Sequence, residues 1–388
     1  MKKFDGVDFL EIDGLFSEDE IAVRDLARKF VSERVIPIIE GHNRAGTFPM
    51  DLVPEMGELG FYGATIDGYG CAGLSSVQYG LIMQELERGD SGLRSFVSVQ
   101  GALCMYPIFA YGSEAQRKKY LPEMATGKII GCFGLTEPDF GSNPSGMLTT
   151  ARKDGNSYIL NGSKMWITNG GIAQLAIVWA KLDGVIRGFL VENGTPGYST
   201  KDQHGKFSLR ASVTSELSMQ DCRIPAENML AEAKGLKGPL GCLNQARYGI
   251  GWGGVGAAMA VYHEALEYAK TRVQFDRPIA GFQMVQEKLT WMIREITKAQ
   301  LLVLQVGRLK DKGTVKPEHI SLAKMNNVHI ALQAARMARE ILGANGITDE
   351  YQSGRHMCNL ESVYTYEGTH DIHTLIIGEA ITGIPAYK

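Results

Sequence analysis

The hydrophobic pattern of this chain changes its period twice, and these changes predict three structural regions. From about residue 17, apolar residues such as Ala22, Leu26 and Phe30 recur at helical spacing, and helical runs continue to about residue 127. From about 128 to 235 the apolar runs become short, β-branched or aromatic, and bounded by turn residues. Helical runs of 20 residues or more then return. The pattern predicts an N-terminal α-helical domain (1–127), a small middle β domain (128–235) and a C-terminal helical bundle (236–388).

Local signals refine this division. Ser17 and Glu20 have the spacing of a capping box and predict that a helix begins there. In GNSYILNGSKMWITN, Asn161–Gly162 separates two strand-like runs and predicts a β-hairpin turn. The glycine-rich stretch AKGLKGPLG, residues 233–241, is interpreted as the linker into the bundle.

Composition narrows the class of protein. The chain has 388 residues, whereas a single core stops growing at about 250–300 residues. A hydrophobic share of 44% excludes intrinsic disorder, and a net charge of −3 without a basic block makes nucleic acid a poor candidate partner. No apolar window reaches the roughly 18–20 residues of a membrane helix. The start resembles neither a signal nor a transit peptide, and the six cysteines form no CxxC pair, so we expect buried, reduced thiols in a cytoplasmic protein.

Two motifs are interpreted as structural. Residues 251–256 (GWGGVG) match GxGxxG, but that fingerprint binds nucleotides only between a strand and a helix. Here the glycines lie inside a long apolar helical run, which favours close helix packing. His370 and His373 stand three residues apart on a predicted helix, but no third ligand is evident. A capping or core role is favoured over a metal site, and no metal is expected.

Two segments are candidates for chemistry. Residues 132–146 (CFGLTEPDFGSNPSG) are rich in Gly, Thr and Ser, which suits either an ordinary connecting loop or a loop that binds an anionic or heteroaromatic ligand. In residues 365–380, Thr369 resembles a helix N-cap with Asp371 in the first turn. Glu367 precedes this helix and follows Tyr364 and Tyr366. A carboxylate in apolar surroundings has a raised pKa and can act as a base near neutrality. The alternative is a surface glutamate in a loop.

A third segment, residues 87–95 (ERGDSGLRS), places an arginine at an expected break between two helices. Gly89 and Gly92 are expected to break a helix, and Arg94 is expected to open the next one. From the residues alone, the usual interpretation of Arg94 is a solvated surface charge.

At these motifs the chain resembles the acyl-CoA dehydrogenase family. The resemblance runs from about residue 15 to the C-terminus and rests on five blocks in the family's order, namely FGLTEPDFGS, WITN, RVQFDRPI, ILGANGI and TYEGTHDIH. Within the family it is strongest to the glutaryl-CoA dehydrogenases, through CFGLTEP, GKFSLRAS, CLNQARYGI, NLESVYTYEGTHDIH and AITGI. The resemblance implies a mixed α and β fold with an N-terminal helical domain, a middle β-barrel-like domain and a C-terminal four-helix bundle. It also implies a homotetramer with one FAD per subunit and an electron-transferring flavoprotein as electron acceptor.

The resemblance assigns roles to individual residues. Glu367 becomes the catalytic base, since Ala246 occupies the position from which some relatives supply theirs. The flavin contacts within one subunit would be Phe133, Leu135, Thr136, Ser142, Trp166, Thr168, Thr369 and Asp371. A neighbouring subunit would add Arg272, Phe275, Gln283, Glu340, Gly343 and Ala344. The contacts with acyl-CoA would be Ser142, Leu243, Asn244, Arg247 and Gly368.

The resemblance also implies a substrate and a product. Arg94 would bind the distal carboxylate of glutaryl-CoA, with Glu87 and Ser95 orienting it. Tyr366 stands before the base, as in the members that decarboxylate their product to crotonyl-CoA, where non-decarboxylating members have valine. Leu93 and Asn143 depart from commoner family residues and affect fine specificity. The alternatives are a short- or branched-chain acyl-CoA dehydrogenase, a non-decarboxylating glutaryl-CoA dehydrogenase, and a catalytically silent flavin-binding subunit.

Overall fold

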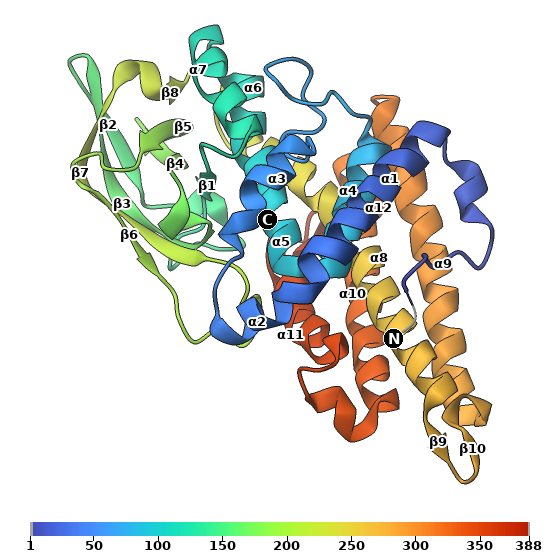
Figure 1. Cartoon of the computed structure of the whole chain (residues 1–388). Helices are drawn as coiled ribbons and strands as arrows, with labels where there is room; N and C mark the ends of the chain where they lie inside the picture. Colours follow the sequence, from blue (N-terminus) through green and yellow to red (C-terminus); the bar gives the residue numbers. More distant parts are fainter. Residues whose placement is uncertain (1–2, 387–388) are drawn as a thin grey trace.

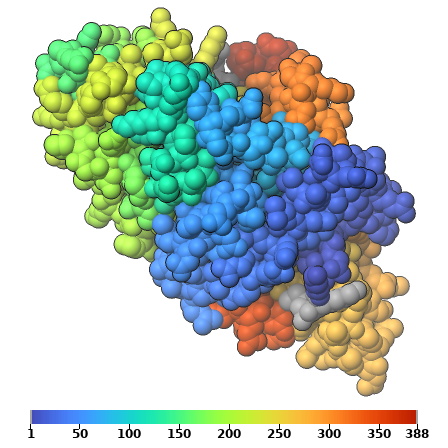
Figure 2. All heavy atoms as spheres, turned by 45° about the horizontal axis from the view of Figure 1, so that its top comes forward, coloured from blue at the N-terminus to red at the C-terminus, as the bar shows by residue number. Residues whose placement is uncertain are grey.

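A computed structural model describes residues 3–386, and its elements fall into a helical region, a sheet region and a second helical region (Figure 1). In the space-filling view, the N-terminal helices lie between the sheet region and part of the C-terminal helices (Figure 2). The mixed fold class predicted from the sequence is confirmed. The exact domain limits 1–127, 128–235 and 236–388 remain a prediction.

The N-terminal region is built from helices that begin at well-formed caps. The predicted capping box is confirmed, because the backbone N–H of Ser17 donates to Glu20 at 2.9 Å and that of Glu20 to Ser17 at 3.3 Å. The helices are α1 (Glu18–Phe30), α2 (Ile36–Ala45), α3 (Val53–Glu58), α4 (Ser76–Gly89), α5 (Ser91–Ser98), α6 (Tyr106–Tyr111) and α7 (Glu114–Ala125).

The middle region is one mixed sheet with its apolar side chains packed inside. Its strands follow the order β6-β7-β3-β2-β4-β5-β8, and β1 pairs with β4 in parallel. Trp179 and Phe189, on neighbouring antiparallel strands, are fully buried in its core. The strands are β1 (Gly131–Gly134), β2 (Thr150–Asp154), β3 (Ser157–Thr168), β4 (Leu175–Leu182), β5 (Val185–Glu192), β6 (Tyr198–Asp202), β7 (Thr214–Pro225) and β8 (Met229–Leu230).

The hairpin turn predicted at Asn161–Gly162 is wrong. Strand β3 continues through both residues, and the turn lies earlier, at Gly155, between β2 and β3. Gly162 instead lies at an irregularity in the pairing of β3 with β7. Its φ is 143°, and a Cβ there would come within 2.5 Å of the Thr149 hydroxyl oxygen. Pairing with strands on both sides therefore overrides the local turn preference of Asn–Gly. The glycine instead occupies a β-bulge, where its backbone conformation is needed.

The C-terminal region consists of long helices that pack closely on the N-terminal ones. Two of the glycines in 251–256 confirm the packing interpretation, because a Cβ on Gly256 would lie 1.8 Å from the Gln84 carbonyl oxygen and one on Gly254 2.9 Å from Asn327. Helix α8 already begins at Lys237, so only the first part of the predicted linker joins the regions. The helices are α8 (Lys237–Thr271), α9 (Gln283–Asp311), α10 (Pro317–Ile341), α11 (Gln352–Thr365) and α12 (His370–Thr382), with a hairpin of β9 (Val273–Gln274) and β10 (Arg277–Pro278) between α8 and α9.

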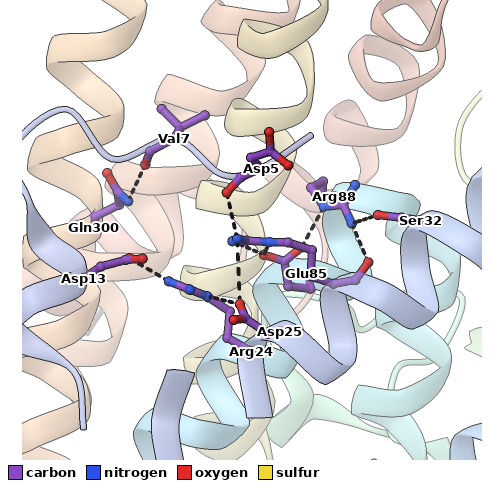
Figure 3. Close-up of polar contacts among 10 residues, drawn as sticks. Asp5, Val7, Asp13, Arg24, Asp25, Ser32, Glu85, Arg88 and Gln300 are labelled. Carbon is purple, nitrogen blue, oxygen red and sulfur yellow. Dashed lines mark hydrogen bonds and ion pairs between the residues drawn. The ribbon is translucent and has the colours of Figure 1, made fainter. Parts of the chain in front are cut away.

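A network of buried charges ties the N-terminal segment to the bundle (Figure 3). Glu85 on α4 accepts hydrogen bonds from Arg28 at 2.9 Å and from Arg88 at 2.6 Å. The side-chain amide of Gln300 on α9 donates to the Val7 carbonyl at 3.0 Å. Removal of Glu85 would take the carboxylate partner from the buried Arg88 and from Arg28, so this carboxylate ties α1 to α4. Helix α4 carries the first residues of the site described below.

The cysteines are all free thiols. Cys104, Cys132, Cys222 and Cys242 are buried as expected, whereas Cys71 and Cys358 are only partly buried. Within residues 3–386, none of the helices combines the length and apolar character that spanning a membrane requires.

Candidate active site

The short loop between α11 and α12, residues 366–368, presents Glu367 in an unusual backbone conformation. Glu367 has φ of 52°, in the left-handed region that a residue with a Cβ adopts only at a cost. Gly368 follows with φ of 94°. The predicted N-cap is confirmed, since the Thr369 hydroxyl accepts from the Ile372 amide at 3.2 Å. Such a conformation persists only where its surroundings hold it.

The Glu367 carboxylate is set up as a base. Its Oε2 atom is buried and has no hydrogen-bond partner among the described residues. Burial raises the pKa of Glu367, while the positive charges of Arg94, Lys324 and Arg247 oppose that shift. A desolvated carboxylate without a donor is a stronger proton acceptor than one on the surface.

Arg94 lies in the interior and not on the surface. It is fully buried, and it pairs with the equally buried Glu87 and with the Tyr366 hydroxyl. The Ser95 and Tyr366 hydroxyls are 3.1 Å apart. The Nη1 atom of Arg94 has no partner among the described residues. One edge of the guanidinium group is therefore left for a further acceptor, which is the geometry for binding a carboxylate.

The loop before Arg94 follows the prediction in part. Helix α4 ends at Gly89, and Asp90 caps α5 by accepting from the Gly92 amide at 2.7 Å. Gly92, however, lies within α5 and breaks no helix. A Cβ there would lie 2.4 Å from the Ala211 carbonyl oxygen, so Gly92 permits close packing of α5 on the middle region.

Helix α8 brings a second arginine to the loop. The Arg247 Nε atom donates to the Glu367 carbonyl at 2.7 Å. A Cβ on Gly368 would come within 3.1 Å of the same guanidinium group, so glycine is needed there. Leu243 and Asn244 are partly buried one turn earlier on α8. The structure therefore brings Glu87, Arg94, Ser95, Arg247, Tyr366, Glu367 and Gly368 together.

Lys324 is a residue of this cluster that the sequence analysis missed. It is 1% exposed, and its Nζ donates to the carbonyl oxygens of Tyr366 at 2.7 Å and Gly368 at 2.5 Å. Burial lowers the pKa of Lys324 to about 7 despite the nearby Glu367. The sequence did contain a sign of this role, because Lys324 interrupts the apolar stripe that Ile320, Val328 and Ala331 form on α10.

The candidate flavin residues of the middle region lie where β1 and β3 end. The Met165 amide donates to the Thr136 carbonyl at 2.9 Å, which joins the Gly/Thr/Ser loop to the WITN segment. Trp166 has φ of 62° and is 62% exposed, and Ser142 is also exposed. Thr168 is partly buried. An exposed tryptophan beside these hydroxyl groups forms a surface for a planar ligand.

Two of the predicted flavin contacts face the interior. Phe133 packs edge-on against Trp179, with ring centroids 6.0 Å apart, and Leu135 is also buried. Their side chains therefore offer little exposed surface to a ligand. Glu137, a further residue missed from the sequence, shapes the loop, because its buried carboxylate accepts from Lys164 at 2.8 Å and from the Leu148 amide at 2.6 Å.

The flavin residues predicted to come from a neighbouring subunit form a separate group at the far end of the bundle. The hairpin that carries Arg272 and Phe275 projects away from the sheet region (Figure 1). Phe275 is 88% exposed, and an ion pair of 2.6 Å between Lys288 and Glu340 links α9 to the end of α10 there. Gln283, Gly343 and Ala344 are exposed as well. Within one chain, this group does not meet the residues of the middle region.

The two histidines lie against the same loop. His373 on α12 is buried. A Cβ on Gly368 would lie 2.9 Å from the Nε2 atom of His373. His370 stacks on Tyr364 with ring centroids 4.6 Å apart. Over residues 3–386, no three His, Cys, Asp or Glu side chains gather in a way that would hold a metal ion.

Comparisons with known proteins identify the class to which this arrangement of a helical domain, a sheet and a helical bundle belongs. Family models of the acyl-CoA dehydrogenase N-terminal, middle and C-terminal domains match residues 17–128, 132–222 and 233–382. The chain belongs to the acyl-CoA dehydrogenase family. It is an oxidoreductase that acts on CH–CH groups, and acyl-CoA dehydrogenases use FAD.

Individual relatives refine this placement. A crystal structure of a glutaryl-CoA dehydrogenase from Mycobacterium smegmatis in complex with FADH2 is 51% identical, covers 98% of this chain and 99% of its own, and has a TM-score of 0.97. A short-chain specific acyl-CoA dehydrogenase from Megasphaera elsdenii is 35% identical over 92% of this chain and 96% of its own. A glutaryl-CoA dehydrogenase from Desulfococcus multivorans is 34% identical over 90% and 93%.

Proposed function

We propose that this protein is a glutaryl-CoA dehydrogenase that oxidises glutaryl-CoA and decarboxylates the product to crotonyl-CoA. The observation that carries the proposal is the buried Arg94, whose Nη1 atom has no partner while Glu87 and Tyr366 occupy its other edge. A buried guanidinium with a free edge suits a substrate that carries a second carboxylate. The similarity to glutaryl-CoA dehydrogenases supports the same substrate.

In this proposal, Glu367 removes the α-proton of the thioester as the β-hydrogen leaves as hydride. FAD, when bound, supplies the hydride acceptor. The backbone N–H of Glu367 donates to the thioester oxygen and stabilises the developing enolate. Arg94 holds the distal carboxylate, which places the α-carbon of the substrate at the base. Arg247, Gly368, Leu243, Asn244 and Ser142 line the path of the acyl-CoA.

Decarboxylation follows from the same residues. Loss of two hydrogens gives glutaconyl-CoA, in which the bond from the γ-carbon to the carboxylate breaks and releases CO₂. The electron pair is delocalised into the thioester as a dienolate. Protonated Glu367 then returns its proton to the γ-carbon, which gives crotonyl-CoA. Tyr366 supports this step because its hydroxyl contacts both Arg94 and Ser95, so it disturbs a planar pairing of Arg94 with the carboxylate.

The product composition tests the decarboxylation. We expect anaerobic turnover of glutaryl-CoA to give crotonyl-CoA and CO₂ in equal amounts, and Tyr366→Val to shift the product toward glutaconyl-CoA. The measurement is chromatography of the acyl-CoA products. Accumulation of glutaconyl-CoA by the unmodified enzyme would identify the non-decarboxylating alternative.

The cofactor assignment rests on the exposed face of the middle region. Trp166 offers a ring for stacking, and Thr136, Thr168 and Ser142 offer hydroxyl groups, so the residues present fit a flavin. Thr369 and Asp371 at the start of α12 complete the set. Because Arg272, Phe275, Gln283, Glu340, Gly343 and Ala344 lie at the far end of the bundle, a second copy of the chain would supply them, which fits a homotetramer.

Bound FAD gives a direct prediction. The purified protein is expected to be yellow with a two-band flavin spectrum, and denaturation is expected to release FAD. Trp166→Ala should lower flavin content, because base–aromatic stacking contributes about 1–3 kcal/mol. A control, Trp291→Ala, removes a partly buried tryptophan from α9, outside the middle region. A colourless protein that cannot be reconstituted with FAD argues against the assignment.

The electron acceptor and the compartment follow from the same proposal. An electron-transferring flavoprotein would accept the electrons, as the resemblance to the family implies. Six free cysteines fit the reducing cytoplasm. A steady-state assay with glutaryl-CoA, butyryl-CoA and an artificial electron acceptor tests the whole proposal. Preference for butyryl-CoA would favour a short- or branched-chain enzyme, and no turnover of either would favour a silent flavin-binding subunit.

A further inference from the structure

The backbone of the base loop is held by two buried cations from the bundle. Lys324 donates to the carbonyl oxygens of Tyr366 and Gly368, at 2.7 and 2.5 Å. Arg247 donates to the carbonyl between them, that of Glu367, at 2.7 Å. Three consecutive carbonyl groups are thus all occupied by charged donors, and charge-assisted hydrogen bonds are the strong ones.

This arrangement determines where the other atoms of the loop point. In a trans peptide the C=O and N–H groups point in opposite directions. When Lys324 holds the Tyr366 carbonyl, the amide of Glu367 therefore faces away from Lys324. The left-handed φ of 52° at Glu367 then directs its side chain. Because that conformation is costly for a residue with a Cβ, it needs contacts that hold the peptides on either side.

We propose that Lys324 is a positioning residue for the reaction, which fixes both the carboxylate and the amide of Glu367 by holding the two flanking carbonyls. The inference rests on the proposed function, because it assigns the base to Glu367. Lys324 itself touches neither substrate nor cofactor in this role. One face of its helix, α10, is buried in the bundle, so Lys324 connects the loop to the core.

Lys324 also places a charge beside the base. Charged and titratable groups surround Glu367 from every element packed on the loop. They are Tyr79 and Glu87 from α4, Arg94 from α5, Arg247 from α8, Lys324 from α10, Tyr366 from the loop, and His370 and His373 from α12. Removal of one positive charge from this group disfavours the carboxylate form of Glu367. The base then stays protonated up to a higher pH.

The test compares Lys324→Met, which keeps the length but removes charge and donors, with the unmodified holoenzyme. Hydrogen–deuterium exchange should become faster in the backbone of 366–369. We expect flavin reduction by glutaryl-CoA to fall by about 10²-fold, as for a misplaced catalytic group, with little change in substrate Kd. The acid limb of the pH–rate profile, the pH range in which the reduction rate falls as Glu367 becomes protonated, should move to higher pH.

Two further variants separate positioning from general damage. Lys206→Met removes a lysine that also donates to two loop carbonyls, those of Leu209 at 2.9 Å and Ser212 at 2.8 Å. It should leave exchange at 366–369 and the acid limb unchanged. Lys324→Arg keeps the charge and should keep the acid limb in place whatever its rate. Should Lys324→Met not fold, Lys324→Gln, which lacks the charge, is measured instead.

The outcomes are distinct. The proposal is overturned if, in Lys324→Met, the exchange rate at 366–369 is unchanged and the acid limb of the reduction rate stays at the same pH. It is also overturned if the acid limb moves by the same amount in Lys324→Arg and Lys324→Met. If the unmodified enzyme does not act on glutaryl-CoA, the proposed function fails. The exchange measurement then still decides whether Lys324 holds the loop.

Discussion

Glu367→Gln is expected to reduce the rate of flavin reduction by about 10²–10⁴-fold while acyl-CoA still binds. Glutamine has the same shape and the same backbone cost in the left-handed conformation, so the bond from Arg247 to the carbonyl of residue 367 remains. Only the proton acceptor is removed. The measurement is stopped-flow reduction of the bound flavin by glutaryl-CoA under anaerobic conditions, with substrate Kd from a separate titration.

A surface substitution of the same type provides the control. Glu361→Gln lies on α11, where Glu361 pairs with Arg336 at 2.7 Å on the surface, and it should leave the reduction rate unchanged. If Glu367→Gln keeps more than about a tenth of the rate, the proton goes to another group. The pH dependence adds a check on sign. Because burial raises the pKa of Glu367, the rate should rise with pH as this carboxyl group ionises.

Arg94→Gln is expected to damage turnover of glutaryl-CoA far more than turnover of butyryl-CoA. Removal of one partner of a buried charge pair costs about 3–5 kcal/mol, which is roughly two to three orders of magnitude or more in kcat/KM. Butyryl-CoA lacks the distal carboxylate, so it loses no such partner. The measurement is kcat/KM for both substrates with an artificial electron acceptor.

The same substitution leaves Glu87 buried and unpaired, so stability needs its own control. Arg94→Gln/Glu87→Gln removes both charges, and it should recover thermal stability but not the preference for glutaryl-CoA. Arg88→Gln removes another buried arginine, which pairs with Glu85, outside the site. It should affect both substrates equally. Equal losses on both substrates from Arg94→Gln would mean that Arg94 is structural.

Much of this protein could be predicted from patterns within a few residues. The capping box at Ser17 and the N-cap at Thr369 appear as predicted, because a cap depends only on neighbours up to three residues away. The glycines of 251–256 could be assigned to helix packing from the helical run around them. The position of Glu367 between aromatic residues and a helix N-terminus already indicated a desolvated carboxylate.

Local sequence patterns gave wrong or incomplete predictions where contacts between distant strands and helices determine the structure. Asn161–Gly162 has the sequence of a turn, but the ladder with β2 and β7 keeps it in a strand. Sequence alone left Arg94 open as a surface charge, whereas the fold buries it against Tyr366, which lies 272 residues further along the chain. Such contacts depend on the packing of whole helices, which a short window does not contain.

The sequence by itself determined the order of the three regions, the helix caps and the motif that carries Glu367, because periodicity and capping are properties of neighbouring residues. Only the tertiary structure decided which charges meet there. Lys324 could be seen in the sequence as one polar residue in an apolar stripe, but nothing near it identified its partners. Its role depends on α10 passing beneath the loop between α11 and α12, where desolvation makes a single buried cation strong enough to hold a backbone.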